Sequence, residues 1–193
     1  MLLQEKLKDK KILLASQSPR RQELLKGLGI EFEIVKIESD ESFPEELKRE
    51  KITEHISENK ANAFRELNPD EILITADTLV WLNNKALGKP ADYEAAFQMI
   101  AEMANSTHEV FTSVTLKSSE KTLTFSETTE VSFDPFSEEE IHFYIKNFQP
   151  FDKAGAYGIQ DWLGYAKIAG IKGCYYNVMG LPLRKLYREF LEF

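Results

Sequence analysis

Two adjacent arginines lie where a helix is predicted to begin. Pro19 suits the first position of a helix, and Arg20 and Arg21 follow it directly. Positive charge is disfavoured there, because the helix dipole already makes the N-terminus positive. Free backbone N–H groups and two guanidinium groups would together suit a phosphate chain. The alternative is that both arginines face solvent or pair with surface carboxylates such as that of Glu23.

A carboxylate follows a predicted apolar strand. Residues 72–76 form an apolar run that favours a buried strand, which places Asp77 at its carboxyl end. Open α/β sheets bind their ligands at this edge, and a carboxylate there can hold Mg²⁺ or orient a water molecule. Because aspartate is also common in turns, the position by itself leaves both interpretations open.

Two further segments combine small residues with polar side chains. Lys89 follows Gly88, which permits close backbone approach, but the spaced glycines of a Walker A loop are missing. In residues 152–160 small and polar residues alternate, and the Gln160 amide could meet the edge of a base with a donor and an acceptor. A solvated lysine and a plain tight turn are the alternatives.

The cysteine and the histidines give weaker signals. Cys174 is the only cysteine, so it cannot form an intramolecular disulfide, and no histidine lies near it in sequence to activate it as a nucleophile. Buried free cysteines are common. His55, His108 and His142 lack the spacing of zinc ligands. Neither thiol catalysis nor a zinc site is favoured.

A mixture of strands and helices is predicted to position these candidates. Extended segments are predicted at residues 12–15, 32–37, 72–76, 79–82, 109–116 and 121–133. Helices are predicted from Ser18 to Gly29, from Thr53 to about Leu67, after Asp92, after the capping box of Ser137 with Glu140, and after Pro182. Short strands and tight turns are expected in the Gly-rich residues 155–173. This mixture predicts an α/β fold with a mixed sheet, and the absence of a linker or repeat predicts one domain over residues 1–193.

Composition limits the partners that this chain is expected to have. It has 193 residues, of which 42% are apolar, enough for one sizeable core. Its 24 basic and 32 acidic residues give a net charge of −8, which repels nucleic acid and anionic membranes, so a bound phosphate would need a local basic cluster. No apolar stretch approaches the roughly 18 residues that span a bilayer, and no signal-type segment is present. We expect a soluble, cytoplasmic protein without nucleic-acid or membrane partners.

Five segments, in this order along the chain, resemble the Maf family of nucleoside triphosphate pyrophosphatases. They are residues 14–25, 76–78, 88–90, 152–160 and 177–183. The first contains an Ala-Ser-x-Ser-Pro-Arg-Arg signature. Any single segment would be ambiguous, but together they extend the resemblance over nearly the whole chain.

The resemblance implies an enzyme that cleaves a nucleoside triphosphate between its α and β phosphates. The products would be a nucleoside monophosphate and pyrophosphate, and the cofactor a divalent cation, Mg²⁺ or Mn²⁺. The implied fold is an elongated α/β structure in which helices flank a mixed sheet, related to the inosine triphosphatase type. Proteins of this family are commonly dimeric, so a homodimer is expected.

The resemblance also assigns roles to single residues. Asp77 matches the proton acceptor that would activate the attacking water. The polar and basic positions that line the phosphate site are matched by Ser16, Arg21, Lys60, Lys89 and Lys153. Glu41 matches an acidic position near the metal, which Asp77 would share.

Three further matches concern the base. Arg20, Thr78 and Gln160 match the positions that distinguish dTTP/UTP pyrophosphatases from a subclass acting on 7-methyl-GTP, and all three are of the dTTP/UTP type. A threonine hydroxyl and a glutamine amide can pair with the oxygens and N–H of a uracil or thymine ring, and such a site rejects a base that leaves them unpaired. The alternatives are a 7-methyl-GTP pyrophosphatase and a nucleotide-binding regulator of septum formation that does not hydrolyse its ligand.

Overall fold

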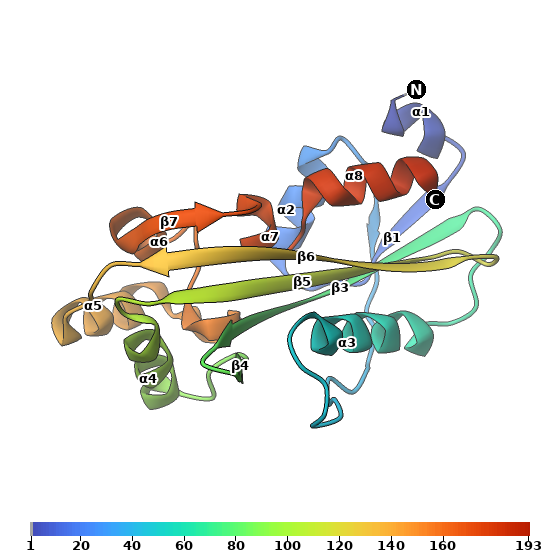
Figure 1. Cartoon of the computed structure of the whole chain (residues 1–193). Coiled ribbons are helices and arrows are strands. Elements are labelled where there is room, and N and C mark those ends of the chain that lie inside the picture. The colour runs from blue at the N-terminus through green and yellow to red at the C-terminus, as the bar shows by residue number, and fades with distance from the viewer. Residues whose placement is uncertain (1) are drawn as a thin grey trace. The chain divides into compact units, whose positions relative to one another are not determined.

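The computed structural model describes residues 2–193, which form a mixture of helices and strands (Figure 1). The strands are β1 (Lys11–Leu14), β2 (Glu33–Ile34), β3 (Glu71–Leu82), β4 (Lys85–Leu87), β5 (Thr107–Lys117), β6 (Thr122–Phe133) and β7 (Ile168–Lys172). The α-helices are α1 (Leu3–Leu7), α2 (Pro19–Gly27), α3 (Glu50–Ala63), α4 (Tyr93–Met103), α5 (Glu138–Phe148), α6 (Trp162–Lys167), α7 (Tyr175–Val178) and α8 (Leu183–Glu192). Two 3₁₀ turns, η1 (Pro150–Asp152) and η2 (Ala154–Ala156), lie between α5 and α6.

The strands form a seven-stranded mixed sheet. Its order is β2-β1-β3-β5-β6-β7, and β4 pairs with β3 outside this path. Strand β1 is parallel to both β2 and β3, whereas β4 and β7 pair antiparallel with β3 and β6. The predicted α/β class, with helices flanking a mixed sheet, is confirmed.

The chain divides into two compact units. Unit 1 comprises the residues up to Asp77 together with residues 112–127 and 180–193, and unit 2 comprises residues 78–111 and 128–179. Strands β3, β5 and β6 contribute residues to both units. The single domain over residues 1–193 stays a prediction.

Unit 1 is organised around the parallel strands β1 and β3. Leu13 and Leu73 are partners in the ladder and are buried together with Ala61 of α3, which explains why these strands are apolar. Helix α2 begins at Pro19, as predicted, and the chain leaves it through Gly29 in the left-handed region, at φ 70°. The sequence did not predict α1, because it is one short turn in a charged segment.

Unit 2 has a core of its own, where α4 packs against α5. Ile100 and Met103 of α4 and Tyr144 and Ile145 of α5 are all fully buried. The predicted caps of both helices are confirmed. The Asp92 carboxylate accepts a hydrogen bond from a first-turn backbone N–H, and the predicted capping box forms at the start of α5.

The prediction that a strand ends just before Asp77 was wrong, because β3 runs without a break from Glu71 to Leu82. What changes along β3 is its neighbour. Strand β1 pairs with residues 71–74, and β4 pairs with residues 80–82. Asp77 therefore lies inside β3 but beyond its last β1 partner, which is still past the carboxyl end of the parallel pair.

Three other boundaries differ from the predictions. The strand predicted at 32–37 is reduced to β2, and the helix predicted from Thr53 to Leu67 begins and ends earlier, as α3. The Gly-rich segment contains the helix α6, where Gly164 packs directly on the backbone of Ile159. A glycine that permits such close packing cannot be told in sequence from one that forms a turn.

Candidate functional site

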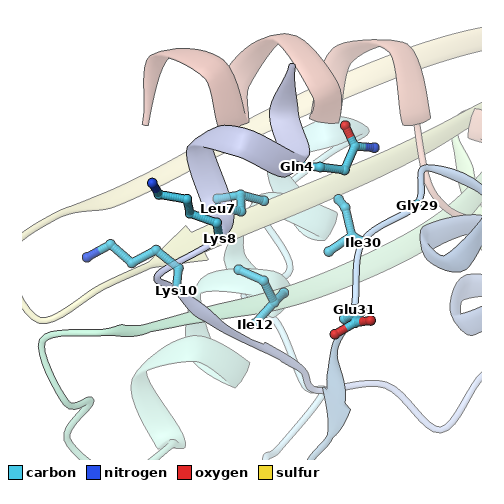
Figure 2. A pocket seen from close by; sticks show the side chains of 8 residues that line it. All are labelled: Gln4, Leu7, Lys8, Lys10, Ile12, Gly29, Ile30 and Glu31. Atoms are coloured by element: carbon cyan, nitrogen blue, oxygen red, sulfur yellow. The ribbon is translucent and has the colours of Figure 1, made fainter. Parts of the chain in front are cut away.

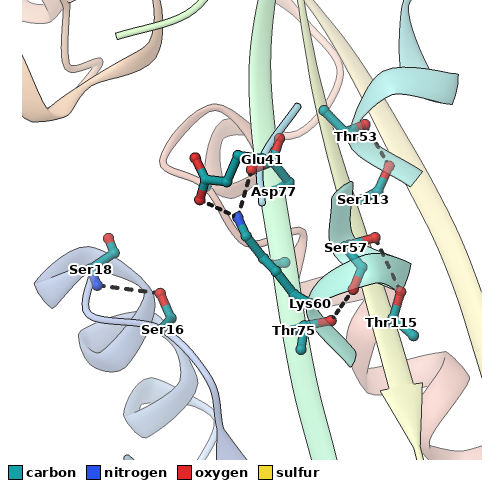
Figure 3. A network of polar contacts seen from close by, with 12 residues as sticks. Ser16, Ser18, Glu41, Thr53, Ser57, Lys60, Thr75, Asp77, Ser113 and Thr115 are labelled. Carbon is teal, nitrogen blue, oxygen red and sulfur yellow. Dashed lines mark hydrogen bonds and ion pairs between the residues drawn. The ribbon is translucent and has the colours of Figure 1, made fainter. Parts of the chain in front are cut away.

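Lys60 links two acidic residues in unit 1, as Figure 3 shows. The Lys60 Nζ lies 3.0 Å from Asp77 Oδ1 and 2.8 Å from Glu41 Oε1. The Asp77 and Lys60 side chains are only 16% and 13% exposed, whereas that of Glu41 is 54% exposed. The structure thus brings together three predicted site residues, from β3, from the last turn of α3 and from the segment before α3.

The environment of Asp77 perturbs its protonation. Burial raises the pKa of the Asp77 carboxyl above its usual 3.8, because desolvation disfavours the charged form. The positive charges of Lys60 and Arg21 oppose this shift, while the negative charge of Glu41 adds to it. A raised pKa makes the Asp77 carboxylate a better proton acceptor than an exposed aspartate.

Arg21 lies in the first turn of α2, where part of its guanidinium binds the backbone. Its Nε donates to the Gly180 carbonyl at 2.8 Å, and its Nη1 donates to the Ala76 carbonyl at 2.9 Å. The side chain therefore joins α2 to β3, next to Asp77, and to the segment before α8. Desolvation lowers the pKa of Arg21, but a guanidinium starts so high that it stays charged.

Ser16 is buried at the turn between β1 and α2. Its Oγ accepts a hydrogen bond from the Ser18 backbone N–H at 3.3 Å, and its carbonyl accepts one from Gln22 Nε2 at 3.2 Å. Ser18 occupies the N-cap position, but its own side chain makes no capping bond. The hydrogen bonds of Ser16 thus stabilise the turn between β1 and α2. Arg20 follows this turn and is half-buried.

In unit 2 the turn before Lys89 contacts the segment that contains Lys153. The Gly155 N–H donates to the Gly88 carbonyl at 3.0 Å, so two of the segments predicted to bind ligand lie side by side. Lys89 itself is exposed. The Lys153 Nζ lies 2.9 Å from Asp152 Oδ1 and 3.6 Å from Asp161 Oδ2, so a phosphate would compete with these carboxylates for it.

Gln160 and Thr78, the predicted base-recognition residues, also belong to unit 2, where both are half-buried. The Gln160 Oε1 is buried and has no hydrogen-bond partner among residues 2–193. Leaving a buried acceptor without a hydrogen bond costs free energy. Here the acceptor belongs to a residue that is predicted to recognise the base.

The contacts that hold the loop before Gln160 were not predicted from the sequence. The Tyr144 hydroxyl donates to Asp161 Oδ2 at 3.1 Å and accepts from the Gly158 N–H at 3.0 Å. The signal was a tyrosine rather than a phenylalanine on a core-facing helix stripe, because a buried tyrosine hydroxyl needs partners.

The donor set fits a divalent cation. The carboxylates of Glu41 and Asp77 already converge on one cationic atom, the Lys60 Nζ, and Mg²⁺ is typically held by one or two carboxylates together with substrate phosphates. Within residues 2–193 no group of three or more His, Cys, Asp or Glu side chains is arranged to hold a metal by itself. A cation here would therefore need oxygens from the substrate.

A separate cavity of about 340 Å³ lies in unit 1 (Figure 2). Its walls come from α1, β1 and the segment after α2, and they are formed by Gln4, Leu7, Lys8, Lys10, Ile12, Gly29, Ile30 and Glu31. None of the predicted site residues lines it. The cavity is therefore not the candidate active site.

One known protein family matches most of the chain. This family, described as Maf-like protein, matches residues 11–193. The chain belongs to the Maf family. The Maf resemblance drawn from the five sequence segments is thereby confirmed.

Curated Maf relatives match over nearly their whole length. A protein of Flavobacterium johnsoniae named dTTP/UTP pyrophosphatase is 52% identical over 98% of this chain and 98% of its own. Proteins of the same name from Flavobacterium psychrophilum and Bacteroides thetaiotaomicron are 49% and 48% identical, over 99% and 92% of this chain and 98% and 93% of their own.

A solved structure supports the expected fold. The structure of a HAM1 protein from Coxiella burnetii superposes with a TM-score of 0.50 at 15% identity, covering 95% of this chain and 100% of that one. At this identity the likeness concerns the fold alone. Across residues 2–193, no helix has the length and apolar character required to cross a membrane.

Proposed function

We propose that this Maf protein hydrolyses dTTP and UTP to the nucleoside monophosphate and pyrophosphate. The observation that carries the proposal is the buried Asp77 carboxylate held by the Lys60 ammonium at 3.0 Å, with Glu41 on the same ammonium. A protein that only binds nucleotide would have no need of a desolvated carboxylate there. The names of the curated relatives support the same activity.

In the proposed reaction Asp77 accepts a proton from water. The water oxygen attacks the α-phosphorus, the bond from that phosphorus to the bridging oxygen breaks, and pyrophosphate leaves with the bond electrons. Such reactions depend mainly on positioning and on neutralising phosphate charge. The side chains proposed to bind the phosphates are Ser16, Arg21, Lys60, Lys89 and Lys153.

We propose that Glu41 and Asp77 hold the divalent cation, Mg²⁺ or Mn²⁺, together with substrate oxygens. When bound, the cation supplies positive charge to the phosphate oxygens. Lys60 would keep its contact with Asp77, and its ammonium, released from Glu41, would turn to a phosphate. Arg21 keeps its two backbone bonds and would place the positive charge of its guanidinium against the phosphates.

Base selection is proposed to depend on Gln160, Thr78 and Arg20. The unused Gln160 Oε1 is an acceptor that suits the N3–H donor of uracil or thymine. Replacing Gln160 by alanine should blunt the preference for these bases while other triphosphates are cleaved as before. An unchanged ranking of nucleotides would contradict this role.

We further propose a homodimer that works in the cytoplasm on free nucleotides and binds no nucleic acid. The net charge of −8 supports the last point, since it repels polyanions. Sedimentation of the purified chain would separate dimer from monomer.

The decisive experiment is pyrophosphate release from a panel of nucleoside triphosphates, with Mg²⁺ or Mn²⁺ and after chelation. We expect dTTP and UTP to be the best substrates, and chelation to abolish turnover. Asp77→Asn should abolish turnover while triphosphate binding survives, whereas Asp70→Asn, at an exposed position, should behave as wild type. Near-wild-type turnover by Asp77→Asn would refute the role of Asp77. A preference for 7-methyl-GTP, or binding without turnover, would favour the corresponding alternative.

A further inference from the structure

Buried hydroxyl groups line the contact between α3 and the strands of unit 1. Five such residues are fully buried: Thr53, Ser57, Thr75, Ser113 and Thr115. Figure 3 shows them beside Lys60 and Asp77. Because a buried hydroxyl is costly unless it is hydrogen-bonded, its position is dictated by its partners.

Two of the hydrogen bonds involve Ser57, which lies in the same helix as Lys60. The Thr75 Oγ1 donates to the Ser57 carbonyl at 2.6 Å, and the Thr115 Oγ1 donates to the Ser57 Oγ at 3.1 Å. Ser57 precedes Lys60 by three residues, so the two share a face of α3. Thr75 precedes Asp77 by two residues, so these two share a face of β3. The Thr75–Ser57 bond thus joins the same two faces as the Lys60–Asp77 ion pair.

A second group of hydroxyl hydrogen bonds lies about one turn of α3 away. The Thr53 and Ser113 hydroxyls are 2.6 Å apart, and Ser113 in turn bonds the Ser126 hydroxyl of β6 at 2.9 Å. The Ser126 Oγ also donates to Glu54 Oε1 of α3 at 2.7 Å. Hydrogen bonds at two places along α3 define its position along its axis and its rotation about that axis.

Directional bonds add to the apolar packing of α3, because a hydrogen bond is lost when its two atoms move apart by about an ångström. A slip of one residue moves a helix by about 1.5 Å along its axis and rotates its side chains by about 100°. Such a slip would carry the Lys60 Nζ beyond hydrogen-bond range of Asp77 Oδ1, now 3.0 Å away. An apolar pair could stabilise the fold as well as a buried hydroxyl pair, but its attraction is not directional.

We propose that Thr75 and Ser57 are positioning residues, which fix the register of α3 on β3 so that the Lys60 ammonium stays against Asp77. This inference rests on the proposed function, in which Lys60 serves catalysis. Neither Thr75 nor Ser57 is assigned a contact with the substrate.

The test compares three variants by pyrophosphate release from dTTP. Thr75→Val keeps the shape of the side chain but removes the hydroxyl, and we expect kcat/KM to fall about tenfold, since coupled residues in one network commonly interact by this much. Thr75→Ser keeps the hydroxyl and should stay within about twofold of wild type. Thr107→Val, which removes the exposed hydroxyl pair of Thr107 with Ser132, is the matched control and should be unchanged.

A second measurement separates positioning from general destabilisation. In a Lys60→Gln background, Thr75→Val should lower kcat/KM less than about twofold further, because the group that it positions is already absent. Equal losses in both backgrounds would overturn the inference. A crystal structure of Thr75→Val should show the Lys60 Nζ beyond hydrogen-bond range of Asp77, and an unchanged 3.0 Å contact would overturn it too. If Thr75→Val does not fold, Thr115→Val breaks the other bond to Ser57 and carries the same expectations.

Failure of the inference can be told from failure of the proposed function. A wild-type protein without pyrophosphatase activity, or a Lys60→Gln variant as active as wild type, would contradict the proposed function, and the crystal structure would still test the positioning. An impaired Lys60→Gln beside an unimpaired Thr75→Val would overturn the inference alone.

Discussion

Arg21 is expected to stabilise the fold as well as to bind phosphate, and the two contributions can be separated. Its guanidinium donates to the carbonyls of Gly180 and Ala76, which are 159 and 55 residues away in sequence. Hydrogen bonds from charged donors contribute about 1.5–3 kcal/mol each to stability, so losing both would cost about 3–6 kcal/mol. That is a large part of the roughly 5–15 kcal/mol that stabilises a typical domain.

Arg21→Lys is the informative change, because an ammonium can reach one of these carbonyls but cannot span both. We expect the free energy of unfolding in urea to fall by about 1.5–3 kcal/mol, the value of one such bond, with an unchanged denaturant slope. The kcat/KM for dTTP should fall as well, and Arg21→Ala should lower it strongly. Arg184→Lys, an exposed arginine of α8, is the control and should leave both quantities unchanged. An Arg21→Lys variant as stable as wild type would refute the structural role, and unchanged kinetics would refute the phosphate role.

Three further predictions concern acid stability, the pH profile and a tight turn. Two bonds from Arg65 hold the pKa of Glu71 down at about 2, so the stabilisation is present above pH 4.5 and is lost as pH falls from 4.5 towards 2. Glu71→Gln should flatten acid unfolding in that window; an unaltered curve would contradict this. Because burial raises the pKa of Asp77, the acidic limb of the kcat/KM profile should lie above pH 3.8, with activity falling as pH falls through it; a limb at or below 3.8 would count against Asp77 as proton acceptor. Gly155→Ala should cost about 1–3 kcal/mol in thermal unfolding, because Gly155 has φ 67° and an added Cβ would lie 2.9 Å from Val80 Cγ2; an unshifted midpoint would refute the reasoning.

Local sequence signals predicted the parts of the fold that depend on neighbours along the chain. Pro19 begins α2, and the caps at Asp92 and Ser137 begin α4 and α5, because a cap needs only residues within one turn. The extent of β3 was not predicted. A polar Asp-Thr pair inside a strand looks like a strand end until the neighbouring strands are known.

The candidate site was predicted in part. The segments around Arg21, Asp77 and Gln160 stood out by residue type and by resemblance to one family. Their partners did not, because the bonds from Arg21 go to backbone carbonyls, and any residue carries one of those. Tyr144, which holds the loop before Gln160, looked like one more apolar member of a helix stripe.

The class of fold, the family and the chemical types gathered for phosphate chemistry could be predicted from the residues, because each depends on residue types and short spacings. That one ammonium, Lys60, contacts both Asp77 and Glu41, and that buried hydroxyls hold the helix which carries it, could be seen only in the folded chain. Those facts depend on where distant elements pack against each other, and packing to within an ångström is a property of the whole core rather than of any segment.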